Sequence, residues 1–269
     1  MASTSTVSAP VPIAVHGASG RMGQAVLRLA AADPAFSVAA ALVRAGSPML
    51  GTRVADAPGL AYCSELAGDA AASVLLDVSN ARAFDAALAL ARDRAIAFVS
   101  GTTGLDARQQ AAMEEASASI AVLWAANFSL GVALLRRLVA QAAAALPEWD
   151  CEIVEVHHAR KLDAPSGTAL ELGRAVAAAR GRELAEVAAS GRAGAAALRG
   201  PGSIGFASLR AGDVVGEHTV MFAGPGERVE VVHRAADRDV FARGALAAVR
   251  WMARRGAGLY RLEEVLAGD

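Results

Sequence analysis

The feature that most constrains the fold is a glycine-rich segment near the N-terminus, Gly17-Ala18-Ser19-Gly20-Arg21-Met22-Gly23. It follows the apolar run Ile13-Ala14-Val15, which predicts a buried strand, and it leads into a stretch whose apolar spacing predicts a helix ending at Ala32. A strand, a glycine loop and a helix in this order are typical of a dinucleotide-binding unit, in which the helix N-terminus attracts phosphate. The spacing is Gly-x-x-Gly-x-x-Gly, so an ordinary glycine-rich turn between strand and helix stays open as an alternative.

Strands and helices go on alternating as far as residue 128, which predicts a parallel sheet covered on both faces. The expected strands are Phe36–Val43, Ser73–Val78, Ala95–Ser100 and Ile120–Trp124, and the expected helices are Ala81–Arg92 and Asp106–Ser117. After Ser129 the pattern changes. It predicts a helix to Leu146, a strand Cys151–His157, a helix Ser166–Arg180, an irregular stretch Gly181–Gly205, antiparallel strands Phe206–Arg210, Val214–Phe222 and Arg228–His233, and a final helix Asp239–Arg254.

We therefore predict an α/β protein with a Rossmann-type doubly wound parallel sheet and an inserted α+β domain. The first domain covers residues 1–128, with 237–269 returning to it, and the second covers 129–236.

Composition excludes several classes of function. The chain has 26 basic and 27 acidic residues and a net charge of −1, so nothing draws it generally to nucleic acid or to an anionic membrane. Aromatic residues make up 4%, too few for a base-stacking surface. No apolar run reaches transmembrane length, and the N-terminus lacks the basic and apolar regions of a secretory signal. We expect a soluble, cytoplasmic protein.

The residue after the second strand normally selects the nucleotide. A carboxylate there binds the ribose hydroxyls of NAD, and a basic residue accepts the 2′-phosphate of NADP. Here the strand ends Leu42-Val43-Arg44, without a carboxylate, and Arg21 in the glycine loop is a second candidate for phosphate. We predict that NADPH is the preferred cofactor, without excluding NADH. The alternative is that Arg44 is a solvated surface residue.

The densest set of reactive side chains lies at His157-His158-Ala159-Arg160-Lys161. Adjacent histidines on a strand point to opposite faces, and no further ligand follows at a metal-binding spacing, so we expect no metal site. Proton transfer and anion binding fit these residues better, since histidine titrates near neutral pH and lysine adds a positive charge.

The run Pro165-Ser166-Gly167-Thr168 then opens a helix. Backbone N–H groups at that end, with the two hydroxyls, can bind a carboxylate-sized anion. Together with the basic residues before it, this run favours a small polyanionic substrate. The alternative is a basic surface loop followed by an ordinary serine or threonine cap.

Several motifs occur in an order that resembles a known family. They are the glycine loop at Gly17–Gly23, Gly101-Thr102-Thr103-Gly104, Ala125-Ala126-Asn127-Phe128-Ser129, the segment Glu155–Thr168 with its Lys-x-Asp-Ala-Pro-Ser-Gly-Thr run, and Gly212-Asp213-Val214-Val215-Gly216-Glu217-His218-Thr219. Together they resemble the 4-hydroxy-tetrahydrodipicolinate reductase family, also called dihydrodipicolinate reductase, of bacterial lysine and diaminopimelate biosynthesis.

The resemblance implies roles for individual residues. His157 would be the proton donor and Lys161 a second proton-donating residue, while substrate carboxylates would contact His158, Gly167 and Thr168. Nucleotide contacts would come from Gly17, Ala18, Ser19, Gly20, Arg21, Met22, Gly101, Thr102, Thr103, Ala125, Ala126, Asn127 and Phe128. The second domain would bind substrate and form a homotetramer.

The implied activity is the NADPH-dependent reduction of 4-hydroxy-tetrahydrodipicolinate, a small dicarboxylate, to tetrahydrodipicolinate. Two alternatives share the glycine loop. One is a Rossmann reductase for another small acid, which gives no reason for the paired histidines before the Pro-Ser-Gly-Thr helix start. The other is a non-enzymatic NADPH sensor.

Overall fold

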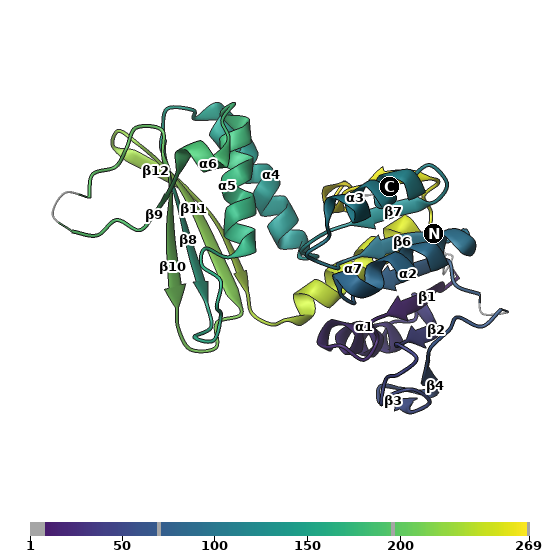
Figure 1. Ribbon diagram of the computed structural model, residues 1–269. Coiled ribbons are helices and arrows are strands. Elements are labelled where there is room, and N and C mark those ends of the chain that lie inside the picture. Colours follow the sequence, from purple (N-terminus) through teal and green to yellow (C-terminus); the bar gives the residue numbers. More distant parts are fainter. Residues whose placement is uncertain (1–8, 69–70, 195–196, 268–269) are drawn as a thin grey trace, which may run out of the picture. The chain divides into compact units, whose positions relative to one another are not determined.

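The computed structural model describes residues 9–68, 71–194 and 197–267 and divides the chain into two compact units (Figure 1). Unit 1 comprises Met1–Ser129 and Asp239–Asp269, and unit 2 comprises Leu130–Arg238. Each unit has its own sheet and its own apolar core, so each is described by itself.

Unit 1 is built on a mostly parallel sheet. Among the described residues its strand order is β13-β7-β6-β5-β1-β2-β4-β3, and every neighbouring pair is parallel except β3 and β4. The strands are β1 Val11–His16, β2 Phe36–Leu42, β3 Arg53–Val54, β4 Ala57–Cys63, β5 Val74–Asp77, β6 Ala97–Ser100, β7 Ala121–Trp124 and β13 Gly258–Tyr260. This is the Rossmann-type sheet that the sequence predicts.

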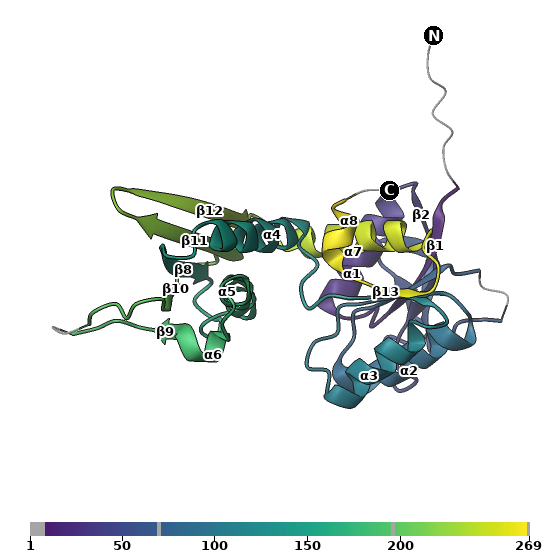
Figure 2. The same ribbon diagram turned by 90° about the horizontal axis from the view of Figure 1, so that it is seen from above.

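Helices cover both faces of this sheet, and Figure 2 shows α1 and α7 on one face and α2 and α3 on the other. The helices are α1 Arg21–Ala32, α2 Ala81–Asp93, α3 Ala107–Ala116, α7 Asp239–Met252 and α8 Leu262–Val265. Every residue of β5 and β6 is buried, because a strand covered on both faces has no side exposed to water. Phe84 of α2 and Phe98 of β6 meet edge to face in this core, with ring centroids 5.6 Å apart.

Unit 2 is a sheet with two long helices on one of its faces (Figure 1). Its strand order among the described residues is β12-β11-β8-β10-β9. The elements are α4 Leu130–Ala145, β8 Asp150–His157, α5 Gly167–Ala179, α6 Leu184–Val187, β9 Ala188–Ser190, β10 Ile204–Arg210, β11 Gly216–Gly224 and β12 Glu227–Ala235. Burial alternates along β8, so that Ile153, Glu155 and His157 share its buried face.

The structure corrects two expectations for unit 2. The strand predicted at Phe206–Arg210, here β10, is parallel to β8 and β9 and not antiparallel. The reason is that α5 lies in the connection from β8 to β10, and a helical crossover returns the chain to the same end of the sheet. The stretch Gly181–Gly205 was predicted to be irregular, yet it contains α6 and β9, although residues 195–196 lie outside the described residues.

A histidine lies in the interior of unit 2. His218 of β11 is 4% exposed, and its Nδ1 has no hydrogen-bond partner among the described residues. The pKa of His218 is lowered to about 4, mainly by burial and also by the charges of His157 on β8, His233 on β12 and Lys161, against the opposing effect of Glu155. The folded protein therefore holds this imidazole neutral at neutral pH.

This burial predicts a pH-dependent loss of stability. Because the pKa of His218 is about 4 when folded and 6.5 when unfolded, only the unfolded chain takes up a proton between these values. Stability should therefore fall as pH drops from 6.5 to 4, by about 3 kcal/mol at 1.36 kcal/mol per pKa unit. In His218→Gln the slope of unfolding free energy against pH should flatten in this window, as measured by urea unfolding. Parallel curves for the two proteins would contradict the assignment.

Candidate functional site

The glycine loop of unit 1 joins the end of β1 to the start of α1. Gly17 has a φ of +78°, and a Cβ on it would lie 2.8 Å from the backbone of Ser79. A Cβ on Gly23 would lie 2.4 Å from the Gly17 carbonyl oxygen, so close packing of helix and loop requires glycine there too. Gly20 is the exposed N-cap of α1 and makes no side-chain cap bond, which leaves the first turn of the helix accessible to an anion.

The other sequence-predicted nucleotide contacts gather at the same sheet edge, where parallel strands end. Thr102 is buried and Thr103 exposed just after β6, and the Ala125–Phe128 segment follows β7. A Cβ on Gly101 would lie 2.6 Å from the ring of Phe128, so these two segments pack directly against each other. Arg44 is exposed beyond the end of β2, beside the glycine loop, because Ala18 N donates to Leu42 O at 3.1 Å. Glycines where the backbone segments approach each other closely, and a helix N-terminus open to an anion, are the features expected of a dinucleotide-binding site.

A buried carboxylate, which the sequence analysis did not single out as a site residue, organises this edge. Asp77, the last residue of β5, accepts hydrogen bonds from Ser79 Oγ at 2.6 Å, Ser100 Oγ at 2.9 Å and Thr102 Oγ1 at 2.7 Å. His16 Nδ1, at the end of β1, lies 2.9 Å from Asp77 Oδ1. Burial raises the pKa of Asp77, but the hydrogen bonds from these neighbours outweigh it and lower that pKa. The carboxylate therefore stays ionised and links the ends of three adjacent strands.

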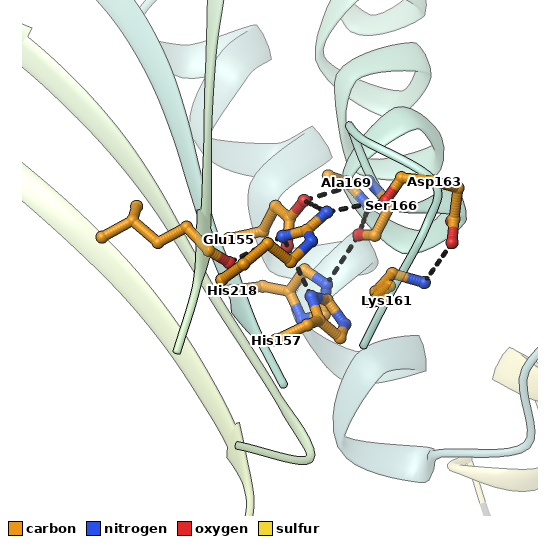
Figure 3. Close-up of polar contacts among 9 residues, drawn as sticks. Glu155, His157, Lys161, Asp163, Ser166, Ala169 and His218 are labelled. Carbon is orange, nitrogen blue, oxygen red and sulfur yellow. Dashed lines mark hydrogen bonds and ion pairs between the residues drawn. The ribbon is translucent and has the colours of Figure 1, made fainter. Parts of the chain in front are cut away.

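The second cluster lies in unit 2, at the end of β8, where His157 is 9% exposed (Figure 3). Glu155, two residues earlier on the same face, accepts a hydrogen bond from His157 Nδ1. The ring of His218 stands edge-on to that of His157, with centroids 5.2 Å apart. One ring nitrogen of His157 is thus fixed by a carboxylate, which leaves Nε2 to serve as a proton donor.

Glu155 is fully buried and fully hydrogen-bonded. Arg210 of β10 donates to both of its oxygens, at 2.9 and 2.8 Å, and the Ser166 backbone N–H donates to Oε1 at 3.2 Å. Burial alone raises the pKa of Glu155, but the hydrogen bonds from Arg210, Ser208 and His157 outweigh it and hold the pKa at about 2. The carboxylate is therefore ionised at neutral pH.

The loop after β8 leads to the predicted anion site at the start of α5. Lys161 Nζ pairs with Asp163 Oδ1 at 2.9 Å, and the Lys161 side chain is 20% exposed. Ser166 is buried and caps α5, because its Oγ accepts from Ala169 N at 3.2 Å and lies 3.2 Å from His218 Nε2 (Figure 3). The Ser166 hydroxyl is therefore committed to the fold. Gly167 is exposed and Thr168 half-buried in the first turn that follows.

Positive charge surrounds His158. Partial burial and the charges of Arg238 and Arg160 lower the pKa of His158, with smaller effects from His157 and Lys161. His158, Lys161 and the N-terminal turn of α5 thus belong to one basic region of unit 2, which suits a small anion with more than one negative charge.

Sequence reasoning missed Glu155 and Arg210 as site residues and gave no role to His218. Glu155 carried one usable signal, since a carboxylate shared the alternating face of Ile153 with His157. Arg210 carried none, because it is 55 residues away and reaches Glu155 only through the pairing of β10 with β8. No group of three metal-ligating side chains is found among the described residues. In the same part of the chain, no helix has the length and apolar character needed to cross a membrane.

Comparison with known proteins identifies the family. The chain matches the family model "Dihydrodipicolinate reductase, N-terminus" over residues 11–128 and "Dihydrodipicolinate reductase, C-terminus" over residues 131–266. It is 49% identical over 257 residues to the 4-hydroxy-tetrahydrodipicolinate reductase of Stenotrophomonas maltophilia (strain R551-3), covering 96% of this chain and 98% of that protein. The same enzyme of Xanthomonas euvesicatoria is 49% identical over 256 residues, covering 95% and 98%.

A solved structure shares the fold. Dipicolinate-bound dihydrodipicolinate reductase from Paenisporosarcina sp. TG-14 matches with a TM-score of 0.75 at 23% identity, covering 95% of this chain and 99% of that chain. The sequence and fold comparisons agree over nearly the whole chain. The protein therefore belongs to the dihydrodipicolinate reductase family and is an oxidoreductase that uses a nicotinamide cofactor.

Proposed function

We propose that this protein reduces 4-hydroxy-tetrahydrodipicolinate to tetrahydrodipicolinate in the diaminopimelate route to lysine, with NADPH as the preferred cofactor. It works in the cytoplasm as a homotetramer. Unit 1 holds the cofactor and unit 2 binds the dicarboxylate. The observation that carries the proposal is the pairing of a buried histidine, His157, with a basic anion site on the same unit.

The residues of unit 2 have separate tasks in the reaction. The α5 turn at Gly167 and Thr168 binds one substrate carboxylate, with His158 and Lys161 supplying positive charge. Loss of water from the substrate gives a conjugated imine, and a nicotinamide held by unit 1 would supply the hydride that reduces the ring. His157, as imidazolium, then breaks its Nε2–H bond and gives the proton to the carbanion-like ring carbon, keeping the electron pair on nitrogen.

The residues of unit 1 suit the cofactor. Gly17, Gly20 and the first turn of α1, with Ala18, Ser19, Arg21 and Met22, bind the pyrophosphate. Arg44 binds the 2′-phosphate, which favours NADPH over NADH. The segments Gly101–Thr103 and Ala125–Phe128 contact the nicotinamide half.

A coupled assay tests the activity directly. A dihydrodipicolinate synthase generates the unstable substrate in the cuvette, and the loss of NADPH absorbance reports its reduction. We expect oxidation of NADPH that depends on the synthase, and slower oxidation of NADH. If neither cofactor is oxidised, the proposed function is wrong.

The proton-donor role predicts the behaviour of His157→Gln. Its kcat should fall by about 10²–10⁴-fold, because that is the usual contribution of a positioned general acid. The KM for NADPH should stay the same, because the cofactor binds to unit 1. His233→Gln, on the outer strand β12 of the same sheet, is the matched control and should keep its kcat. A His157→Gln enzyme with nearly wild-type kcat would refute the role.

Lys161 is the only lysine in the chain, and every other basic side chain is arginine. An arginine-rich composition makes a lysine at this position informative. An ammonium is compact and can lose its proton, whereas a guanidinium is planar and stays charged. A lysine therefore suits a small site that binds a carboxylate and in which the same side chain also donates a proton.

This argument predicts different results for two substitutions of Lys161. Lys161→Met should lower kcat/KM by about 10- to 100-fold, since a charge-assisted hydrogen bond contributes about 1.5–3 kcal/mol. Lys161→Arg keeps the charge, so it should largely restore KM while kcat stays low. Steady-state kinetics, with dipicolinate as a competing ligand, separates the two effects. Full activity in Lys161→Arg would show that only the charge matters.

The cofactor assignment predicts a selective effect at Arg44. In Arg44→Ala the KM for NADPH should rise by about tenfold, which corresponds to one lost exposed phosphate contact of about 1.4 kcal/mol, while the KM for NADH should not change. Arg53→Ala, another exposed arginine of unit 1, is the control. Equal changes for both cofactors would show that Arg44 does not select between them.

A further inference from the structure

His157, the candidate general acid, lies next to a buried carboxylate, Glu155, that has more hydrogen-bond partners than packing alone would require. Glu155 is buried at the end of β8 and accepts hydrogen bonds from the His157 ring, from the Ser166 N–H and from both terminal nitrogens of Arg210. Taking the Glu155 carboxylate out of water costs several kcal/mol, so its pair with the half-buried Arg210 adds little stability by itself. Stability therefore does not explain why a carboxylate is buried here, and the contact with His157 suggests that its role is in the chemistry of that histidine.

We propose that Glu155 is a positioning residue: held ionised by Arg210, it fixes His157 with its proton on Nδ1 and so makes Nε2 the nitrogen that donates to substrate. This inference rests on the proposed function, because it assigns Glu155 a task in the protonation step.

The geometry supports each part of this assignment. An ionised carboxylate only accepts hydrogen bonds, so the His157 nitrogen facing it must carry a proton. The neutral ring left after proton transfer is then already the tautomer that can be protonated again at Nε2. A Cβ on Gly216 would lie 3.1 Å from His157 Nε2, so the backbone of β11 passes close to the donating nitrogen and restricts the ring. Thus Glu155 holds the ring at Nδ1, and the absence of a side chain on Gly216 leaves room beside Nε2.

Arg210 extends this positioning to the anion site. One of its terminal nitrogens donates to the Asp163 carbonyl at 2.6 Å, in the loop that carries Lys161. The Ser166 N–H on Glu155 anchors the start of α5 in the same way. A single carboxylate therefore sets the relative positions of the proton donor and of the segment that binds the substrate carboxylate.

The pH profile separates positioning from a merely structural role. The charged or titratable groups around the pair are Arg210 from β10, His218 from β11, and His158, Lys161 and Asp163 from the segment after β8. Glu155→Gln removes the negative charge beside the imidazolium and destabilises it. The alkaline limb of kcat, where the general acid loses its proton, should therefore move to lower pH. The kcat of Glu155→Gln should fall by about 10- to 100-fold, which is within the usual contribution of a general acid.

Two further variants complete the comparison. Glu155→Asp keeps the charge, so its alkaline limb should return toward the wild-type position even if kcat recovers only in part. Glu152→Gln is the matched control, because Glu152 lies on the same strand and also pairs with an arginine, Arg192 at 2.9 Å. It should leave both kcat and the limb unchanged. If Glu155→Gln matches Glu152→Gln in both readouts, the inference is wrong.

Nitrogen NMR of the wild-type protein tests the inference even if Glu155→Gln fails to fold. With ¹⁵N-labelled histidine, and with the His157 signals assigned from the His157→Gln spectrum, neutral His157 should be the Nδ1–H tautomer. A predominant Nε2–H tautomer would overturn the inference. The coupled assay keeps this outcome distinct from failure of the proposed function, which an inactive wild-type enzyme would show whatever the tautomer.

Discussion

The candidate catalytic unit depends on one ion pair, between the buried Glu155 and the half-buried Arg210. The pair joins two strands that a crossover helix separates in sequence, and it can form only because β10 runs parallel to β8 and places Arg210 opposite His157. Each oxygen of the carboxylate has partners, so the cost of burying the charge is offset by hydrogen bonds and not left uncompensated. The histidine and the start of α5 are then positioned by the same group.

Unit 1 also contains a buried, ionised carboxylate that several hydrogen bonds hold in place, but its neighbours are different. Asp77 is also a buried carboxylate at a strand end, and it also pairs with a histidine, His16. Its other partners are the Ser100 hydroxyl at the end of β6, and Ser79 and Thr102 in the segments that follow β5 and β6, so it joins strand ends and loops instead of a candidate proton donor. At both sites a buried, ionised carboxylate holds the segments that line the site.

Local pattern was sufficient for much of this structure. The glycine loop predicted the first βαβ unit, because the glycines are needed where Gly17 has a positive φ and where Gly23 touches the loop backbone. The His157–Thr168 segment led to the prediction of an anion site, because the candidate proton donor, the lysine and the helix start lie close together in sequence, and the anion site stays a prediction.

What local pattern could not supply was pairing over long distances in the chain. The direction of β10 follows from the crossover through α5, and the short strands β3, β9 and β13 are too brief to show a period. The partnership of Glu155 with Arg210 follows from that same strand pairing. A buried carboxylate on an alternating strand was visible in the sequence, but its partner was not.

Lys161 has a practical consequence beyond its charge. Because it is the only lysine, its Nζ is the only side-chain amine among 269 residues, and this half-buried side chain lies in the loop before α5. An amine-directed label, or lysine carrying a single isotope, would therefore give one side-chain signal, and that signal would come from the region where we place the substrate carboxylate. Lys161 is thus a natural spectroscopic probe of the candidate substrate site, and no residue has to be substituted to use it.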